Sequence, residues 1–230
     1  MSTLVENFEA VRARIADAAR RSSRDSSEVE LIAVSKTETV DTVLRARELC
    51  GQQHFGENRA DELQRKVSAC LDAGTPLDFH FIGPLQTNKV RKVVGATSLI
   101  HSVDSQRLLR AIDARAKLAG IIQPVLIQVS ISGEEAKQGI EPAELDALLQ
   151  LVNEDLENIQ VNGLMTMAPF IAAEQVRWIF EALRELRDRT DGDGPQVALR
   201  ELSMGMTGDF EVAIEEGATL VRIGTALFAG

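Results

Sequence analysis

The sequence predicts a single (β/α)8 barrel of the TIM type, an α/β fold, with one extra N-terminal helix in front of the first strand. Eight short apolar runs recur along the 230 residues, and a helical pattern separates each run from the next. A strict alternation of strand and helix implies a parallel sheet, and eight such units can close into a barrel. We therefore expect residues 1–230 to form one domain.

The expected strands are spread over the whole chain. They are Leu31–Val34 leading to Lys36, His54–Glu57, Asp78–Gly83, Leu99–Asp104, Pro124–Ser130, Val161–Met167, Glu201–Met206 and Leu220–Thr225. Between them, apolar residues recur at helical spacing, as they do from Leu145 to Val152. The same spacing from Leu4 to Ile15 predicts the additional helix.

Glycines and a proline mark the expected ends of helices. Each of five glycines follows a helical run and precedes a strand, where a left-handed C-cap favours a residue without a Cβ: Gly51, Gly74, Gly95, Gly120 and Gly217. Pro142 suits the first turn of a helix. A doubly wound open sheet is the alternative fold. It usually carries a glycine-rich fingerprint after its first strand, and this chain has Ser35, Lys36 and Thr37 there.

Composition and charge exclude several classes of function. The net charge of −10 argues against a nucleic-acid-binding surface, which needs a basic stripe. No stretch reaches the roughly 18 to 20 continuous apolar residues of a membrane span, so we expect a cytoplasmic protein. Cys50 and Cys70 lack CxxC spacing, and we interpret both as reduced thiols without a catalytic role.

In such barrels the active and binding sites lie at the C-terminal ends of the strands. Lys36 ends the first strand, after a run apolar enough to be buried on both faces. If Lys36 points inward, Ile32 and Val34 do so below it, and poor solvation of the ammonium favours the neutral, nucleophilic amine. The alternative is a lysine that extends to solvent from the end of a strand.

Two glycine-containing turns predict a phosphate site. One is Gly205–Asp209, between the seventh strand and a helix that runs to about Glu216, and the other is the turn of Gly224 and Thr225 after the eighth strand. Backbone amides in such turns approach an anion closely, and a helix N-terminus adds a favourable dipole. Phosphate sites in these barrels commonly follow strands seven and eight. Both segments could instead be tight turns without a ligand.

Arg222 is expected to point inward on the eighth strand, with Val221 and Ile223 facing the helices. A buried arginine needs an acceptor, which could be Glu201 or a pyridine nitrogen of a ligand. We predict no metal site, because His54, His80 and His101 show no HExxH or His-x-His spacing and no common height in the barrel. We interpret all three as satisfied core or lower-rim histidines.

Several segments resemble the pyridoxal-phosphate homeostasis protein family, whose members are similar to the barrel domain of alanine racemase. They are LIAVSKT, HFGENRADELQRK, FHFIGPLQTNK, HSVDS, VLIQVSIS, KQGI, GLMTMAP, LSMGMTGDFEVAI and GATLVRIGTALF. They follow the order of the family from Leu31 to Phe228, so the resemblance covers nearly the full chain.

The resemblance implies bound pyridoxal 5′-phosphate with its aldehyde held as a Schiff base on Lys36. It also implies specific partners for the rest of the cofactor. Arg222 would face the ring nitrogen, and Asn58 would lie near the other polar edge of the ring. The phosphate would be held by Ser203, Gly224 and Thr225, with the backbone near Met204.

The resemblance further implies a carrier or regulator of intracellular vitamin B6 rather than an enzyme, with pyridoxal-phosphate-requiring apo-enzymes as possible recipients and a monomer as the expected state. Racemase-like barrels use a tyrosine from a separate β-domain as the second base. This chain has no tyrosine and ends soon after the eighth strand. Arginine cannot readily give up a proton to the ring nitrogen, which weakens the ring as an electron sink. A weak racemase or lyase, and a Schiff-base aldolase without the cofactor, are the alternatives.

Overall fold

The computed structural model describes residues 3–132, 138–190 and 194–229. Its parallel strands pair in sequence order and close into a barrel because β8 pairs with β1. The strands are β1 Glu30–Val34, β2 His54–Glu57, β3 Asp78–Phe81, β4 Leu99–Val103, β5 Gln123–Gln128, β6 Ile159–Met165, β7 Val197–Ser203 and β8 Leu220–Ile223. The predicted (β/α)8 fold is confirmed. Lys137 of the KQGI segment and the chain ends at residues 1, 2 and 230 lie outside the described residues.

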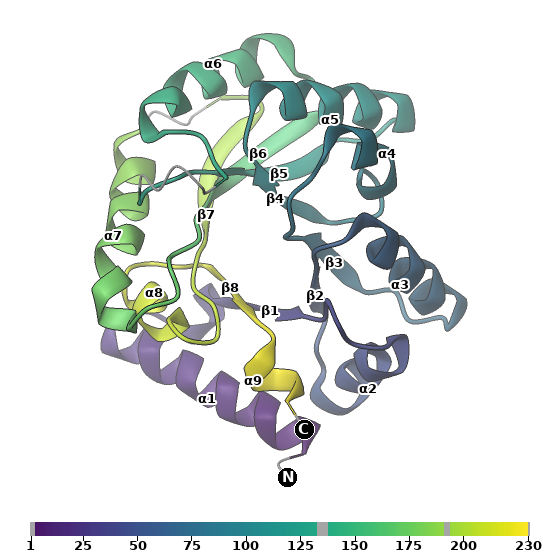
Figure 1. Cartoon of the computed structure of the whole chain (residues 1–230), viewed down its shortest axis with the longest axis vertical. Helices are drawn as coiled ribbons and strands as arrows, with labels where there is room; N and C mark the ends of the chain where they lie inside the picture. The colour runs from purple at the N-terminus through teal and green to yellow at the C-terminus, as the bar shows by residue number, and fades with distance from the viewer. Residues whose placement is uncertain (1–2, 133–137, 191–193, 230) are drawn as a thin grey trace.

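Helices surround the barrel on its outer face (Figure 1). They are α1 Leu4–Arg21, α2 Val40–Cys50, α3 Ala60–Asp72, α4 Val90–Val93, α5 Gln106–Ala119, α6 Leu145–Asp155, α7 Ala173–Arg189, α8 Phe210–Glu215 and α9 Thr225–Phe228. Short 3-10 turns at Ser26–Glu28, Thr87–Lys89 and Pro142–Glu144 complete the helical segments. None of the described helices is both long enough and apolar enough to cross a membrane.

The predicted helix ends agree with the structure. All five predicted glycines have positive φ, between 65° and 100°, and Pro142 begins a 3-10 turn immediately before α6. The additional helix α1 lies along α8 and α9 (Figure 1). The Asn7 amide donates to the carbonyls of Leu227 and Ala229 at 3.1 Å each, so α1 fixes the end of the barrel that follows β8.

Alternation along each strand divides the apolar residues into two cores. Leu31, Ala33 and Val221 belong to the larger core, between strands and helices. The smaller core fills the barrel interior and consists of Ile32, Leu99, Leu126, Met165 and Leu220. The inward direction predicted for Ile32 is therefore confirmed, as period-2 alternation requires.

Six predicted strands continue further at their C-terminal ends than the observed ones. The observed ends are Phe81 in β3, Val103 in β4, Gln128 in β5, Met165 in β6, Ser203 in β7 and Ile223 in β8. The residues beyond these ends form loops, except that Thr225 begins α9. Several of them form the wall of a cavity: Gly83, Met167, Met206, Gly224 and Thr225.

Candidate functional site

A cavity of about 590 Å³ lies at the C-terminal mouth of the barrel. Loops after β1, β2, β3, β6, β7 and β8 form its wall, and its size is typical of a pocket for a small ligand. Most of the residues predicted for the site line this one cavity: Lys36, Asn58, Arg222, Gly224 and Thr225. They meet because the carboxyl ends of parallel strands lie at the same end of a barrel.

Lys36 lies two residues beyond the end of β1, above Val34, which also lines the cavity. Its side chain is exposed. The expectation of a poorly solvated Lys36 ammonium is therefore wrong for the protein without a ligand. Lys36 lies in the loop after β1 and not in the buried strand itself. Lys36 offers an amine at the wall of the cavity, within reach of solvent.

A buried ion pair supports the backbone immediately before Lys36. Lys66 Nζ lies 2.6 Å from Glu57 Oε1 and donates to the carbonyl of Ser35 at 2.5 Å. The Ser35 hydroxyl donates to the same Glu57 oxygen at 2.6 Å. All three side chains are fully buried, so this network ties α3 and β2 to the loop that carries Lys36.

Sequence reasoning placed Glu57 at the C-terminal end of the second strand but missed Lys66 and its pairing with Glu57. A signal was available, because Lys66 lies on the buried face of α3 with Leu63 and Cys70. A lysine in an apolar helical stripe needs a buried partner. The spacing could not identify Glu57 as that partner.

The turns after β7 and β8 bring backbone amides to the cavity. Thr207, Gly208 and Thr225 line it, and within the described part of the chain their amide groups have no hydrogen-bond acceptor. Gly224 lies so close to β1 that a Cβ would be 3.0 Å from the carbonyl oxygen of Val34. The helix α8 has only six residues, so the loop amides are the stronger anion-binding feature.

Asp209 adds a carboxylate to the cavity wall next to these amides. Its Oδ1 accepts a hydrogen bond from the Met206 amide at 2.6 Å. Burial raises the pKa of the Asp209 carboxyl above its ordinary value, while this hydrogen bond and the charge of Arg222 act in the opposite direction. The carboxylate therefore holds the shape of the loop between β7 and α8.

Arg222 is 4% exposed and points to the cavity from β8, as predicted, while Val221 and Ile223 pack in the outer core. Its Nη2 donates to the Thr166 carbonyl at 3.0 Å, and its Nη1 donates to the Ser203 hydroxyl. Burial lowers the pKa of Arg222 to about 10, so the guanidinium stays charged at neutral pH.

The predicted partner Glu201 is not bound to Arg222. Its Oε2 accepts a hydrogen bond from the Thr219 hydroxyl at 2.5 Å. Glu201 lies two residues before Ser203 on β7, nearer the N-terminal end of the barrel. Side-chain alternation places Glu201 and Ser203 on the same face of β7, but it cannot show which of them lies at the height of Arg222 in the barrel.

Ser203 and Met204 are buried away from the cavity wall. Ser203 is fully buried, with its hydroxyl between Arg222 and His101. Met204 packs in the outer core, and its amide donates to the Leu220 carbonyl at 3.2 Å. Neither Ser203 nor Met204 is among the described residues that line the cavity. Their direct contact with the phosphate therefore stays a prediction.

A chain of hydrogen bonds runs from Arg222 down the inside of the barrel. His101 Nδ1 lies 2.8 Å from Ser203 Oγ, and His101 Nε2 lies 2.9 Å from His80 Nδ1. Burial lowers the pKa of His80 to about 3 and that of His101 well below its ordinary value, so both rings are neutral. Because arginine only donates, Ser203 Oγ accepts from Arg222, and the two contacts of His101 can run in either direction, depending on its tautomer.

The three histidines are neighbours in the barrel, but among the described residues only His54 and His80 belong to a group whose ligand atoms all lie within 4.8 Å of one another. The ring centroids of His54 and His80 are 5.5 Å apart, and those of His80 and His101 are 5.2 Å apart. His54 pairs in register with Asp78, two residues before His80. The stagger between barrel strands therefore brings residues from different strand positions to neighbouring heights. Their predicted location is confirmed, because His54 begins β2 at the lower rim and the other two are buried.

The sequence matches a known family over nearly its whole length. Residues 7–230 match the family model of the alanine racemase N-terminal domain. The pyridoxal phosphate homeostasis protein of Aquifex aeolicus is 46% identical over 224 residues, which cover 97% of this chain and 96% of that protein. The protein of the same name from Vibrio cholerae is 39% identical over 234 residues, with coverage of 99% and 96%.

Solved structures agree with this match. PipY of Synechococcus elongatus, whose structure is described as having PLP bound, has a TM-score of 0.82 at 37% identity, with coverage of 94% of this chain and 100% of that one. An alanine racemase of Clostridium difficile has a TM-score of 0.72 at 14% identity, and this chain covers 57% of it. The racemase shares the fold alone. On the sequence matches and the barrel together, the chain belongs to the pyridoxal phosphate homeostasis protein family.

Proposed function

We propose that this chain binds pyridoxal 5′-phosphate in the cavity at the C-terminal mouth of the barrel and serves in its homeostasis. The observation that carries the proposal is the meeting of Lys36, Arg222 and the amides after β7 and β8 at one cavity. These groups match an aldehyde, a ring nitrogen and a phosphate, respectively. The names of the Aquifex and Vibrio relatives and the PLP bound to PipY support the same ligand.

The residues present fit such a group. When bound, pyridoxal phosphate supplies an aldehyde that forms a Schiff base with a lysine and a pyridine ring that withdraws electrons. Lys36 would hold the aldehyde, and Arg222 would donate to the ring nitrogen. Asn58 would lie at the other polar edge of the ring, and the amides of Thr207, Gly208 and Thr225 would bind the phosphate beside Gly224. Ser203 would act through Arg222, since its hydroxyl holds the guanidinium in place.

We infer a role without catalysis from the groups that surround the cavity. The chain has no tyrosine, and neither His80 nor Cys70 lines the cavity in the described structure. Glu38 and Asp209 are the carboxylates that do. Arg222 cannot protonate the ring nitrogen at neutral pH. We therefore favour a cytoplasmic, monomeric carrier or regulator that passes the cofactor to apo-enzymes over a weak racemase or lyase.

Borohydride trapping tests the proposal. The protein is incubated with pyridoxal phosphate, reduced, digested and analysed by mass spectrometry. We expect the phosphopyridoxyl group on Lys36 alone, and no covalent label in Lys36→Arg. Lys117→Arg, which changes a lysine at an exposed position, is the matched control and should label like the unmodified protein. Labelling of another lysine, or an unchanged visible band in Lys36→Arg, would overturn the assignment.

A further inference from the structure

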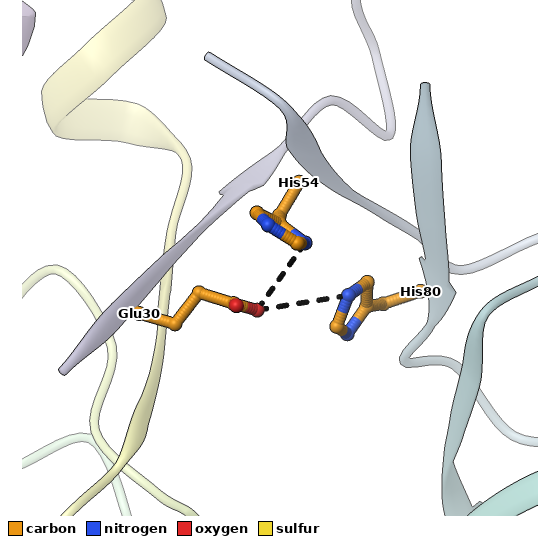
Figure 2. A group of neighbouring side chains, drawn as sticks. All are labelled: Glu30, His54 and His80. Carbon is orange, nitrogen blue, oxygen red and sulfur yellow. Dashed lines mark ion pairs between the residues drawn. The ribbon is translucent and has the colours of Figure 1, made fainter. Parts of the chain in front are cut away.

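A second group of ligand-type side chains lies at the opposite, N-terminal end of the barrel. Glu30, His54 and His80 come from β1, β2 and β3 and point toward one another (Figure 2). Glu30 Oε1 is 3.4 Å from His54 Nδ1 and 3.8 Å from His80 Nε2. One ligand atom from each residue lies within 4.8 Å of the other two.

We propose that Glu30, His54 and His80 bind a divalent metal ion of the zinc class. Two imidazoles and a carboxylate are ligands that suit Zn²⁺, whereas Mg²⁺ and Ca²⁺ prefer oxygen ligands throughout. Bonds of about 2.0 to 2.1 Å in a tetrahedron separate neighbouring ligand atoms by about 3.3 Å. Two of the measured separations already approach this value, so a small rotation of the rings completes the site. A water molecule would take the fourth position.

The hydrogen bonding of His54 supports a role for its Nδ1 as a metal ligand. Its Nδ1 is buried and forms no hydrogen bond within the described part of the chain, although the carboxylate of Glu30 is nearby. A buried polar atom without a partner costs about 1 to 3 kcal/mol, and a metal ion would satisfy it. The whole His54 side chain is 32% exposed, and a cavity of about 370 Å³ beside it is lined by Glu30 and His54. An ion can therefore enter from solvent.

The residues around Glu30, His54 and His80 orient one of the ligands and add negative charge, and both features favour a bound cation. His101 holds His80 Nδ1 at 2.9 Å, so His80 Nε2 is directed toward Glu30. Metal-binding histidines are commonly held in this way through their other nitrogen. Burial raises the pKa of the Glu30 carboxyl, the charge of His54 acts in the opposite direction, and the negative charges of Glu201 and Asp78 raise it further. A bound cation would offset this concentration of negative charge.

Metal binding would fix the direction of the hydrogen-bond chain inside the barrel. Without a ligand on His80 Nε2, the His80 proton can be on either ring nitrogen, because its contact with His101 works in both directions. A metal on Nε2 requires that proton on Nδ1, so His80 would donate to His101, and His101 to Ser203. The tautomer of His80 is therefore a direct report of metal binding.

Calorimetry on protein first treated with a chelator tests the site. We expect the unmodified chain to bind one Zn²⁺, and Co²⁺ to give the visible absorption of a tetrahedral complex. Glu30→Gln and His54→Gln should each weaken binding by at least about 10-fold, since even outer partners of metal ligands contribute 10- to 100-fold. Glu157→Gln removes the same charge from an exposed position and should bind like the unmodified chain. Cys50→Ser tests for capture of the metal by the half-buried thiol at the end of α2.

Three results would overturn the proposal. They are no Zn²⁺ binding by the unmodified chain, equal affinity in Glu30→Gln and His54→Gln, and loss of binding in Cys50→Ser alone. Nitrogen-15 NMR of the three histidines needs no variant and gives an independent answer. At saturating Zn²⁺ the His80 proton should be on Nδ1, and a His80 proton on Nε2 at saturation would also contradict the site. Neither experiment depends on Lys36 or its cofactor.

Discussion

Lys66 and Glu57 form an ion pair with 2.6 Å between Nζ and Oε1, and both side chains are fully buried. The same ammonium donates to the carbonyl of Ser35, the residue before Lys36. The position of the proposed cofactor lysine thus depends on a charge on the inner face of α3.

We expect Lys66→Met to destabilise the protein by about 3 to 5 kcal/mol, because it leaves the Glu57 carboxylate buried without a counter-charge. The double variant Lys66→Met/Glu57→Gln should recover much of this loss. Lys92→Met, which removes a half-buried partner of the exposed Asp61, should cost less than about 1 kcal/mol. Urea unfolding measures all three. Equal losses in Lys66→Met and Lys92→Met would contradict the structural role.

Gly224→Val should weaken retention of pyridoxal phosphate. A Cβ at this position would lie 3.0 Å from the Val34 oxygen and 3.2 Å from the Val34 Cβ, so β1 and β8 must separate at the cavity wall. Each lost charge-assisted hydrogen bond to the phosphate costs about 1.5 to 3 kcal/mol, which corresponds to roughly 10-fold or more in affinity.

The control for this measurement is Gly74→Ala. Gly74 has a φ of +68° and no neighbour within 4 Å of an added Cβ, so alanine there strains the backbone outside the cavity. We expect lower stability and unchanged affinity in a fluorescence titration with the cofactor. Unchanged affinity in Gly224→Val as well would mean that the phosphate binds elsewhere.

Arg222 should keep the bound cofactor catalytically weak. We expect slow or no exchange of the Cα hydrogen when the protein is incubated with L-alanine in D2O, because arginine donates to the ring nitrogen without protonating it. Arg222→Glu should raise exchange, since a carboxylate favours the protonated ring. Arg222→Gln removes the same arginine contacts without adding an acid and should stay low. NMR follows deuterium uptake, and chiral chromatography follows the enantiomer ratio.

Rapid racemisation that disappears in Lys36→Ala would contradict the carrier role. The second base would then be sought among the cavity carboxylates, Glu38 and Asp209. If exchange stays equally slow in Arg222→Glu with the cofactor still bound, ring protonation is not what limits the chemistry.

The two free cysteines should differ in their reaction with iodoacetamide. Burial raises the pKa of both thiols, so less thiolate is present at pH 8 than in a free thiol, and the rate should rise as the pH approaches the higher pKa. Cys50 is half-buried, whereas Cys70 is 1% exposed. We expect slow labelling of Cys50 and labelling of Cys70 only on unfolding. Mass spectrometry with glutathione as reference measures both rates, and equal rates would contradict the burial of Cys70.

The sequence by itself determined the barrel and the end at which a ligand binds. Apolar runs of strand length alternate with helical patterns, and this order implies parallel strands whose carboxyl ends meet. Lys36, Arg222 and Gly224 could therefore be assigned to one mouth of the barrel, because each lies at or near the C-terminal end of a strand. Alternation also fixed the inward direction of Ile32 and Arg222.

Only the tertiary structure decided which side chains at different strand positions meet. Side-chain alternation gives the face of a strand but not the height of a residue relative to other strands, which depends on the stagger of the closed barrel. That stagger pairs Arg222 with Ser203 and Thr166 instead of Glu201, and it brings His54 and His80 to Glu30. The contact between Lys66 and Glu57 depends in the same way on how α3 packs against β2, because a partner across two elements has no fixed spacing in the sequence.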